Sequence, residues 1–260
     1  MASSSSRSRS QTIAELSRRL REIQRRVKSP ESRRPQSGAR SQREAGRKSG
    51  VPHRLLALDS CLLSLDSFER GALVEWLAEG DGSGAGTLAF MAAMRAQSDG
   101  GALVVIDGRG DFYPPAAAAW GLELGETIIV RPSRSRDMVW ALEQSLRCGG
   151  VSAVLCWADE LNALVFRRLQ LAAAAGGTLG LLIRPADYRG HPSWADVRLL
   201  VRPLLSQSES QGRRLHLELL HCRNGMSGGV VELDISDETG VVRVASQLGP
   251  SEAAKRKAGA

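Results

Sequence analysis

The stretch EGDGSGAGTLAF, residues 79–90, stands between an apolar run, GALVEWLA (residues 71–78), and a run with helical character, GTLAFMAAM (residues 86–94). A glycine-rich turn between a strand and a helix aims free backbone N–H groups and the positive end of the helix dipole at one point, and many proteins hold phosphate there. The lysine that such loops usually carry is absent, and the next cation along the chain is Arg95. The stretch therefore predicts an α/β fold and leaves open whether the loop binds a nucleotide.

Short apolar runs alternate with helical segments on both sides of this loop. Strands are predicted at residues 72–77, 103–107, 127–130, 153–157 and 178–183, and helices at residues 86–97, 114–120, 137–146 and 160–175. The strands are near-continuous apolar runs, which is typical of a parallel sheet covered on both faces. Further strands at residues 197–201, 214–221, 230–235 and 241–245, joined by turn signals, predict antiparallel hairpins added to one edge. The predicted fold is a mostly parallel sheet flanked by helices, with hairpins at its C-terminal end.

The composition fits a folded, cytoplasmic protein. The longest uncharged run, Leu169 to Ile183, is shorter than a bilayer span and contains Gln170 and three glycines. The four cysteines form no CxxC pair, and the four histidines have no metal-ligand spacing. We therefore expect reduced thiols, no disulfide framework, no metal and no bound cofactor.

The charge is divided unevenly along the chain. Residues 1–50 hold 14 Lys and Arg against four Glu, a balance of +10, whereas residues 51–260 hold 21 basic and 24 acidic residues, a balance of −3. We predict a basic Arg/Ser-rich arm at residues 1–50, disordered outside one helix, a core at residues 51–248 and a disordered tail at residues 249–260. A basic arm of this kind favours a polyanionic partner, most often DNA.

Residues 11–28 of the arm have the pattern of an amphipathic helix, with Thr12 as a candidate N-cap. The apolar seam, which is the candidate docking surface for a partner or for the core, consists of Ile13, Leu16, Leu20, Ile23 and Val27. The candidate DNA-binding residues on the other face are Arg18, Arg19, Arg21, Arg25, Arg26 and Lys28. The sequence leaves open whether this helix docks on its own chain or on another.

The loop matches two nucleotide-binding patterns in part. Laid on GxxxxGK[ST], it keeps the first glycine, Gly80, and the final Thr87, but Gly86 stands at the lysine position. Weak anion binding through backbone N–H groups would involve Gly80, Gly82, Ser83, Gly84, Gly86 and Thr87. The same residues also match the dinucleotide pattern GxGxxG/A, with Asp107 after the next strand as a candidate ribose ligand.

Several longer strings resemble one family. ALVVIDGRGDFYPP (residues 102–115) and the order of elements around it resemble the core of RecA-type recombinases. Within that group the chain resembles the ImuA family, also called SulA-like or RecA-like damage-inducible proteins. This likeness rests on RGALVEW (70–76), WALEQSLRCGG (140–150), FRRLQLAAAAGGTLGLLIRP (166–185), SWADVRLLV (193–201) and LHLELLHCRNG (215–225).

The resemblance also indicates where catalytic residues of an ATPase would lie. The glutamate that activates the attacking water falls at Arg109, the Walker B aspartate at Trp157 and the phosphate-binding lysine at Gly86. Phosphoryl transfer depends on positioning and on cationic stabilisation of the transition state, so these three losses together predict a protein that is not an enzyme.

The family likeness implies an accessory role in translesion DNA synthesis within the DNA damage (SOS) response. The implied partners are a polymerase-like protein, the RecA recombinase, and DNA through the arm. Two alternatives stay open: a RecA-like repair ATPase whose turnover needs a partner, and a dinucleotide-binding Rossmann-type protein.

Overall fold

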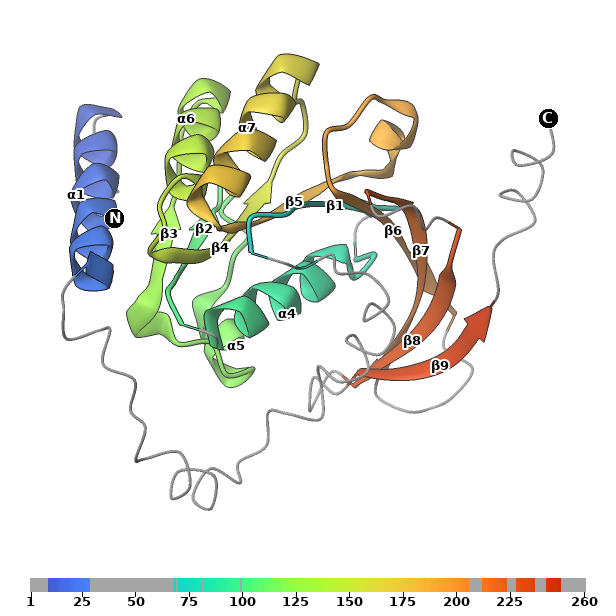
Figure 1. Ribbon diagram of the computed structural model, residues 1–260. Coiled ribbons are helices and arrows are strands. Elements are labelled where there is room, and N and C mark those ends of the chain that lie inside the picture. Colours follow the sequence, from blue (N-terminus) through green and yellow to red (C-terminus); the bar gives the residue numbers. More distant parts are fainter. Residues whose placement is uncertain are drawn as a thin grey trace, which may run out of the picture.

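A single mixed sheet forms the centre of the protein. The computed structural model describes residues 9–28, 68, 70–80, 82–98, 100–205, 212–223, 228–236 and 242–248. Within these ranges the sheet has nine strands in the order β3-β2-β4-β5-β1-β6-β7-β8-β9 (Figure 1). The strands are β1 (Leu73–Ala78), β2 (Ala102–Ile106), β3 (Thr127–Val130), β4 (Val151–Trp157), β5 (Leu179–Pro185), β6 (Val197–Leu204), β7 (Gly212–Cys222), β8 (Val230–Ser236) and β9 (Val242–Leu248).

Helices cover both faces of the parallel part of the sheet. They are α1 (Arg9–Lys28), α4 (Ala85–Ser98), α5 (Pro114–Ala119), α6 (Ser135–Leu146) and α7 (Ala163–Gly176), with the short 3-10 helices η3 (Leu124–Glu126) and η4 (Ala186–Gly190). Helices α1, α6 and α7 lie on one face, and α4 and α5 lie on the other (Figure 1). This arrangement confirms the predicted α/β class.

Strand β6 joins the parallel and antiparallel parts of the sheet. It pairs antiparallel with β7, as predicted, and this antiparallel pairing continues through β8 and β9. The sequence did not predict that β6 also pairs in parallel with β1, for example Val197 with Val74. Strands β5 and β6 lie on either side of β1 and are both parallel to it, so the segment between them, which contains η4, is a crossover and not a hairpin turn.

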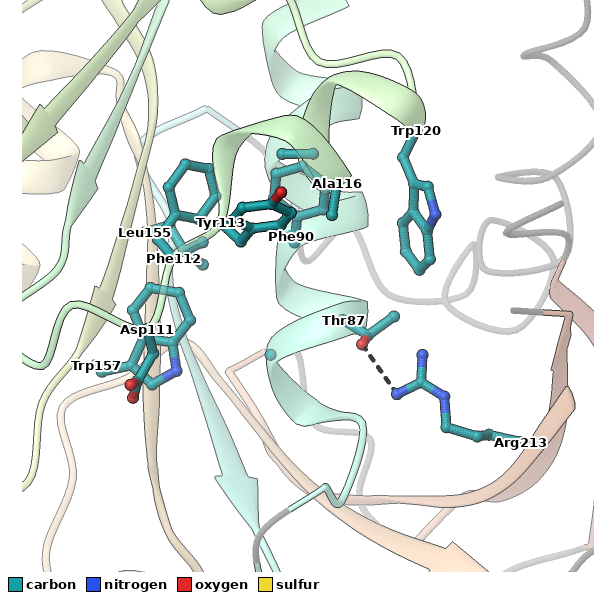
Figure 2. Close-up of a pocket in the computed structure, with 12 residues that line it drawn as sticks. Thr87, Phe90, Asp111, Phe112, Tyr113, Ala116, Trp120, Leu155, Trp157 and Arg213 are labelled. Atoms are coloured by element: carbon teal, nitrogen blue, oxygen red, sulfur yellow. Dashed lines mark hydrogen bonds between the residues drawn. The ribbon is translucent and has the colours of Figure 1, made fainter. Parts of the chain in front are cut away.

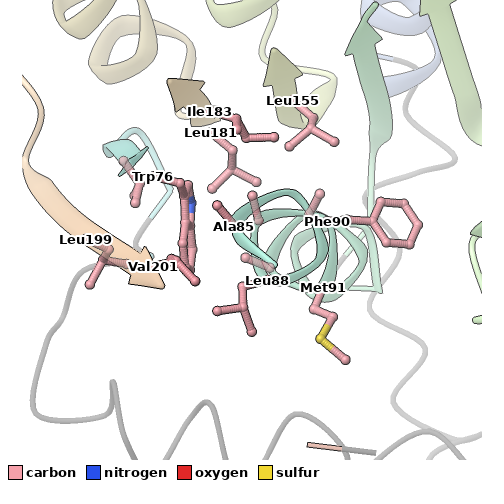
Figure 3. Packing of buried hydrophobic residues seen from close by; sticks show 14 of the residues in the cluster. Trp76, Ala85, Leu88, Phe90, Met91, Leu155, Leu181, Ile183, Leu199 and Val201 are labelled. Atoms are coloured by element: carbon pink, nitrogen blue, oxygen red, sulfur yellow. The ribbon is translucent and has the colours of Figure 1, made fainter. Parts of the chain in front are cut away.

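The core on the α4 face is built from side chains of the central strands. Leu155, Leu181 and Ile183 lie against α4, whose Leu88 is fully buried (Figure 3). Trp76 of β1 is also fully buried and its ring stacks on Phe68 at a centroid distance of 6.0 Å. Burial of each such side chain contributes about 1.5 to 3 kcal/mol, which fixes α4 and the loop before it on the sheet.

Helix α1 packs on the other face, against the core of its own chain. Leu16 and Leu20 are buried there, Ile23 packs against the same cluster, and Cys148 Sγ donates a hydrogen bond to the Leu20 carbonyl oxygen at 3.8 Å. The side chains of Ile13 and Val27 lie outside the described ones. The helix begins at Arg9, so the prediction of Thr12 as its N-cap is wrong. Arg and Gln are good helix formers and extend the helix past this signal.

A buried ionic cluster holds the central strands together. Glu75 of β1 is fully buried and accepts a hydrogen bond from Arg184 Nη1 of β5 at 2.6 Å and another from Arg198 of β6. Arg184 also donates to the carbonyl oxygens of Ala158 and Asp159 after β4. The cluster therefore ties β1, β5 and β6 to the segment that follows β4.

The predicted absence of a membrane span, a metal site and disulfides can be compared with the structure only for the described residues. Among the described residues, no helix is long and apolar enough to cross a bilayer, and no group of His, Cys, Asp and Glu has the arrangement of a metal site. Cys148, Cys156 and Cys222 are buried free thiols, whereas Cys61 lies outside the described residues. The predicted arm outside α1, the start of the core at residues 51–67 and the tail at residues 249–260 also lie outside them.

Candidate functional site

The glycine-rich loop lies where the parallel strands end. Strand β1 ends at Ala78 and α4 begins at Ala85. The loop opens into a cleft of about 570 Å³ that is also lined by Trp157 at the end of β4 and Pro185 at the end of β5. Ligands of open α/β sheets bind outside the carboxyl ends of the strands, so this is the expected position for a binding site.

All six predicted loop residues line this cleft: Gly80, Gly82, Ser83, Gly84, Gly86 and Thr87. Gly80, Gly82 and Gly84 have φ values of 81°, 73° and 84°, in the left-handed region that glycine adopts without strain. A Cβ atom on Gly84 would lie 2.4 Å from Leu215 Cδ1 of β7. Backbone conformation and close packing thus account for the glycine at this position without any ligand.

The lysine position of the phosphate-binding motif falls at the start of α4. If the loop is aligned from Gly80, the lysine position is Gly86, and if Gly84 is taken as the second motif glycine, the position is Ala85. Neither residue has a charge. A Cβ atom on Gly86 would lie 3.8 Å from Trp157 Cζ2, so an indole ring stands next to this point of the loop.

Arg109 and Trp157, which the resemblance placed at two further catalytic positions, line the same cleft as Gly86. Arg109 Nη2 lies 2.5 Å from Asp159 Oδ1, so this acid, two residues beyond Trp157, is held in an ion pair. Glu79 at the loop's start is paired with Arg202. The cleft beside the glycine-rich loop is therefore lined by members of two ion pairs and by an aromatic ring.

The sequence analysis missed Arg213. This residue of β7 lines the cleft, and its Nη1 donates to Thr87 Oγ1 at 3.5 Å. Arg95 is the next cation along the chain, but Arg109 and Arg213 reach the same cleft from distant segments of the sequence. No sequence signal identifies Arg213, since its position follows from the pairing of β7 with β6 far along the chain.

An aromatic pocket of about 260 Å³ adjoins the cleft and shares Gly86, Thr87 and Arg213 with it. Its walls include the aromatic residues Phe90, Phe112, Tyr113, Trp120 and Trp157 (Figure 2). Tyr113 is exposed, whereas Phe90 and Phe112 are buried. The sequence analysis did not predict this pocket, because its rings come from α4, from the segments that flank α5 and from the end of β4.

The structure contradicts the dinucleotide-binding alternative. In the Rossmann order, the first two strands are neighbours, so an acid after the second strand reaches the ribose. Here β4 and β5 separate β2 from β1, and Asp107 does not line the cleft. Its buried carboxylate instead accepts hydrogen bonds from the N–H groups of Gly110 and Asp111 and from Arg131 Nε.

The candidate DNA-binding residues lie away from the loop. Arg18, Arg19, Arg21 and Arg25 are exposed on α1, on the face of the sheet opposite α4, and the side chains of Arg26 and Lys28 are outside the described ones (Figure 1). Hydrogen bonds from Arg18 and Arg19 lower the pKa of Glu15 to about 2. The basic helix and the loop are therefore two separate candidate sites.

Comparisons with known proteins agree with this geometry. No family model matches the chain. It is 28% identical to protein ImuA of Caulobacter vibrioides over 200 residues, which cover 69% of this chain and 81% of that protein. It is 29% identical to protein RecA of Oceanobacillus iheyensis over 124 residues, 48% of this chain and 35% of RecA. The crystal structure of the RadB recombinase superposes with a TM-score of 0.55 at 16% identity and covers 70% of this chain and 94% of RadB.

The sheet order, the loop at the strand ends and the RadB superposition define a RecA-like fold. The likeness to ImuA over most of both chains confirms the resemblance predicted from the sequence: the chain is similar to ImuA proteins.

Proposed function

We propose that the chain is an accessory protein of DNA damage tolerance, with a RecA fold and without ATPase activity. It acts in the cytoplasm in translesion DNA synthesis, through contacts with a polymerase-like partner, with the RecA recombinase, and with DNA through the basic arm. The damage-tolerance role rests on the relationship to ImuA and RecA proteins.

One observation carries the proposed inactivity: Gly86, Arg109 and Trp157 line a single cleft. The chemistry of phosphoryl transfer needs a cation on the phosphates, a metal ligand and a group that orients water. The cleft instead presents a residue without a side chain, a guanidinium and an indole at those points. A fold that has lost its catalytic groups is retained for its surfaces, which supports a role in protein and DNA contacts.

A partner-assisted ATPase is the second candidate, and Arg213 favours it. Its guanidinium lies at Thr87, at the helix N-terminus where an anion would be held, and provides a positive charge that the loop lacks. An arginine supplied by a partner can raise phosphoryl transfer by a factor of about 10³ to 10⁵. This alternative requires that the loop bind ATP in the isolated protein or in the complex.

Two measurements separate the candidates. A ligand present at 100 times its Kd stabilises a protein by about 2.7 kcal/mol, so millimolar ATP with Mg²⁺ should give a clear thermal shift if the loop binds it. We expect no shift, and recovery of polymerase or recombinase components in pull-downs from DNA-damaged cells. A shift that disappears in the Arg213→Ala variant would favour the ATPase, and recovery of neither class of partner would remove the support for the accessory role.

A further inference from the structure

The layer formed by α1, α6 and α7 has a charge distribution that the opposite layer does not share. These three helices with the C-cap residue Arg147 hold 11 Lys and Arg against four Asp and Glu. Helices α4 and α5 on the opposite face hold one charged residue between them, Arg95. The basic character of the arm therefore continues onto one face of the core.

The burial of acidic side chains of α6 makes the outer surface of this layer more basic than its composition alone. Asp137 and Glu143 of α6 are buried, whereas Arg136 and Arg147 are exposed. Glu143 is paired with both Arg147 and Arg168, whose side chains remain more than half exposed. The acids of α6 thus lie within the layer. On α1, Glu22 is exposed and Glu15 is half-buried and paired with Arg18 and Arg19, so the exposed side chains of the layer are mostly cations.

Docking of α1 joins the basic helix to these core arginines. Helix α1 packs beside α6, and α6 packs beside α7 (Figure 1). Packed helices lie about 8 to 10 Å apart, so the axes of α1 and α7 are separated by about 16 to 20 Å. Duplex DNA carries one charge per about 1.7 Å of its axis with both strands counted, so a length of duplex equal to this width carries about 9 to 12 phosphates.

We propose that α1, α6 and α7 together form one binding surface for the phosphate backbone of double-stranded DNA. The described exposed cations of this surface are Arg18, Arg19, Arg21, Arg25, Arg136, Arg147 and Arg168. This inference rests on the DNA contacts proposed for the arm, and it adds the core residues and the duplex as the ligand.

The aromatic residues favour the duplex over single strands. The aromatic side chains of these helices, Trp140 and Phe166, both pack against the core. Proteins that bind single strands without sequence preference stack bases on accessible rings, and the described helices of this layer carry none; the one exposed ring beside α7 in the described residues, Trp194, already has the Arg167 guanidinium over it at 4.7 Å. Binding is therefore to the backbone and independent of sequence.

The test compares two variants of the full chain that have the same change in net charge. The surface variant is Arg136→Gln, Arg147→Gln, Arg168→Gln with Glu143→Gln, so that no buried carboxylate is left unpaired. The control is Arg95→Gln with Arg243→Gln, which removes exposed cations from α4 and β9. Binding to a fluorescent duplex is measured by anisotropy between about 50 and 200 mM salt, the range over which phosphate contacts dominate affinity.

We expect the slope of log K against log salt to become shallower by about 2 to 3 in the surface variant, because each lost phosphate contact removes about 0.9. The control should keep the wild-type slope. Arg136→Gln alone, which leaves both pairs of Glu143 intact, should remove about 0.9 and guards against a folding defect. Replacement of the three arginines by lysine should preserve the slope.

Equal slopes for the surface variant, the control and the wild type would overturn the proposal, as would tenfold tighter binding to an oligo-dT strand than to the duplex. Partner recovery and the absence of ATP turnover do not depend on these residues, so the proposed accessory function stands or falls separately.

Discussion

Arg109 and Asp159 form an ion pair, with Nη2 and Oδ1 2.5 Å apart, at the cleft above the glycine-rich loop. The pair joins the end of β2 to the end of β4, where RecA-type enzymes are expected to present separate carboxylates for water and metal. Arg184 fixes the same segment, since it donates to the Asp159 carbonyl oxygen at 3.0 Å. The strand ends are thus held by internal ionic contacts.

The loop glycines should respond to alanine substitution according to packing. Gly82→Ala places a Cβ in open space at positive φ, and we expect a loss of about 1 kcal/mol of folding free energy. Gly84→Ala adds a clash with Leu215 and should cost about 3 kcal/mol. Urea unfolding measures both values.

The additional variant Leu215→Ala should recover part of the loss in Gly84→Ala, because it removes the atoms that the new Cβ meets. Equal costs for Gly82→Ala and Gly84→Ala would contradict the packing explanation of this glycine.

The docking of α1 depends on Gly150. A Cβ on this residue would lie 2.3 Å from Ile23 Cγ2 and 3.3 Å from the Ile23 backbone, so Gly150→Ala should displace α1 from the core. Hydrogen exchange of residues 9–28 should become about tenfold faster or more, since an amphipathic helix in a protein owes most of its stability to the packing of its apolar face.

Gly149→Ala is the matched control for this substitution. Its Cβ would meet only the Gly176 carbonyl oxygen at 3.7 Å, an ordinary contact, so protection of α1 should be unchanged. If α1 exchanges equally fast in the wild type and in both variants, the cis docking is not the solution state.

Removal of one partner should be strongly destabilising in the buried ionic cluster of Glu75, Arg184 and Arg198. Glu75→Ala leaves two guanidinium groups without their buried partner, and we expect a loss of about 3 to 5 kcal/mol. The more exposed pair of Arg189 with Glu218 is the comparison, and Arg189→Ala should cost less than about 1 kcal/mol. Similar unfolding midpoints for the two variants would show that the buried cluster stabilises the fold no more than the exposed pair does.

Stability should fall at alkaline pH through Cys156. Complete burial raises the pKa of this thiol to about 12, and the nearby Asp159 adds to the shift. An unfolded cysteine ionises near pH 8.5, so between that pH and about 12 the unfolded state loses a proton that the folded state keeps, and the free energy of unfolding decreases.

The effect is isolated by comparing the wild type with Cys156→Ala, because other groups also titrate in this range. The difference in slope should approach about 1.4 kcal/mol per pH unit. Parallel stability curves for the two proteins would show that the thiol does not titrate as burial predicts.

Local patterns predicted the elements well, and long-range pairing explains what they missed. Apolar runs place β3 at residues 127–130 as observed, and Gly121 follows α5 with a φ of 98°. The direction of β6 was not predictable from its own residues, because it depends on which strand it pairs with. The ionic cluster around Glu75 was not predicted for the same reason. Glu75 stands in an apolar run, and its partners come from other strands.

The candidate site was predictable only in part. The loop residues, Arg109 and Trp157 were identified because a motif and a family resemblance placed them in register. Arg213 and the rings of the adjoining pocket come from segments with no motif, and they meet at the loop only through the folded sheet. Sequence reasoning therefore found what the loop lacks and missed what surrounds it.

The central claim is that this RecA-like cleft performs no phosphoryl transfer, and ATP turnover by the purified full chain tests it most directly. Phosphate release should be measured with Mg²⁺ and saturating ATP, with and without duplex DNA. We predict a rate equal to that of a Thr87→Ala, Arg213→Ala variant and to buffer alone. Turnover above this background that is lost in that variant would contradict the account, because it would place a working catalytic site in the cleft.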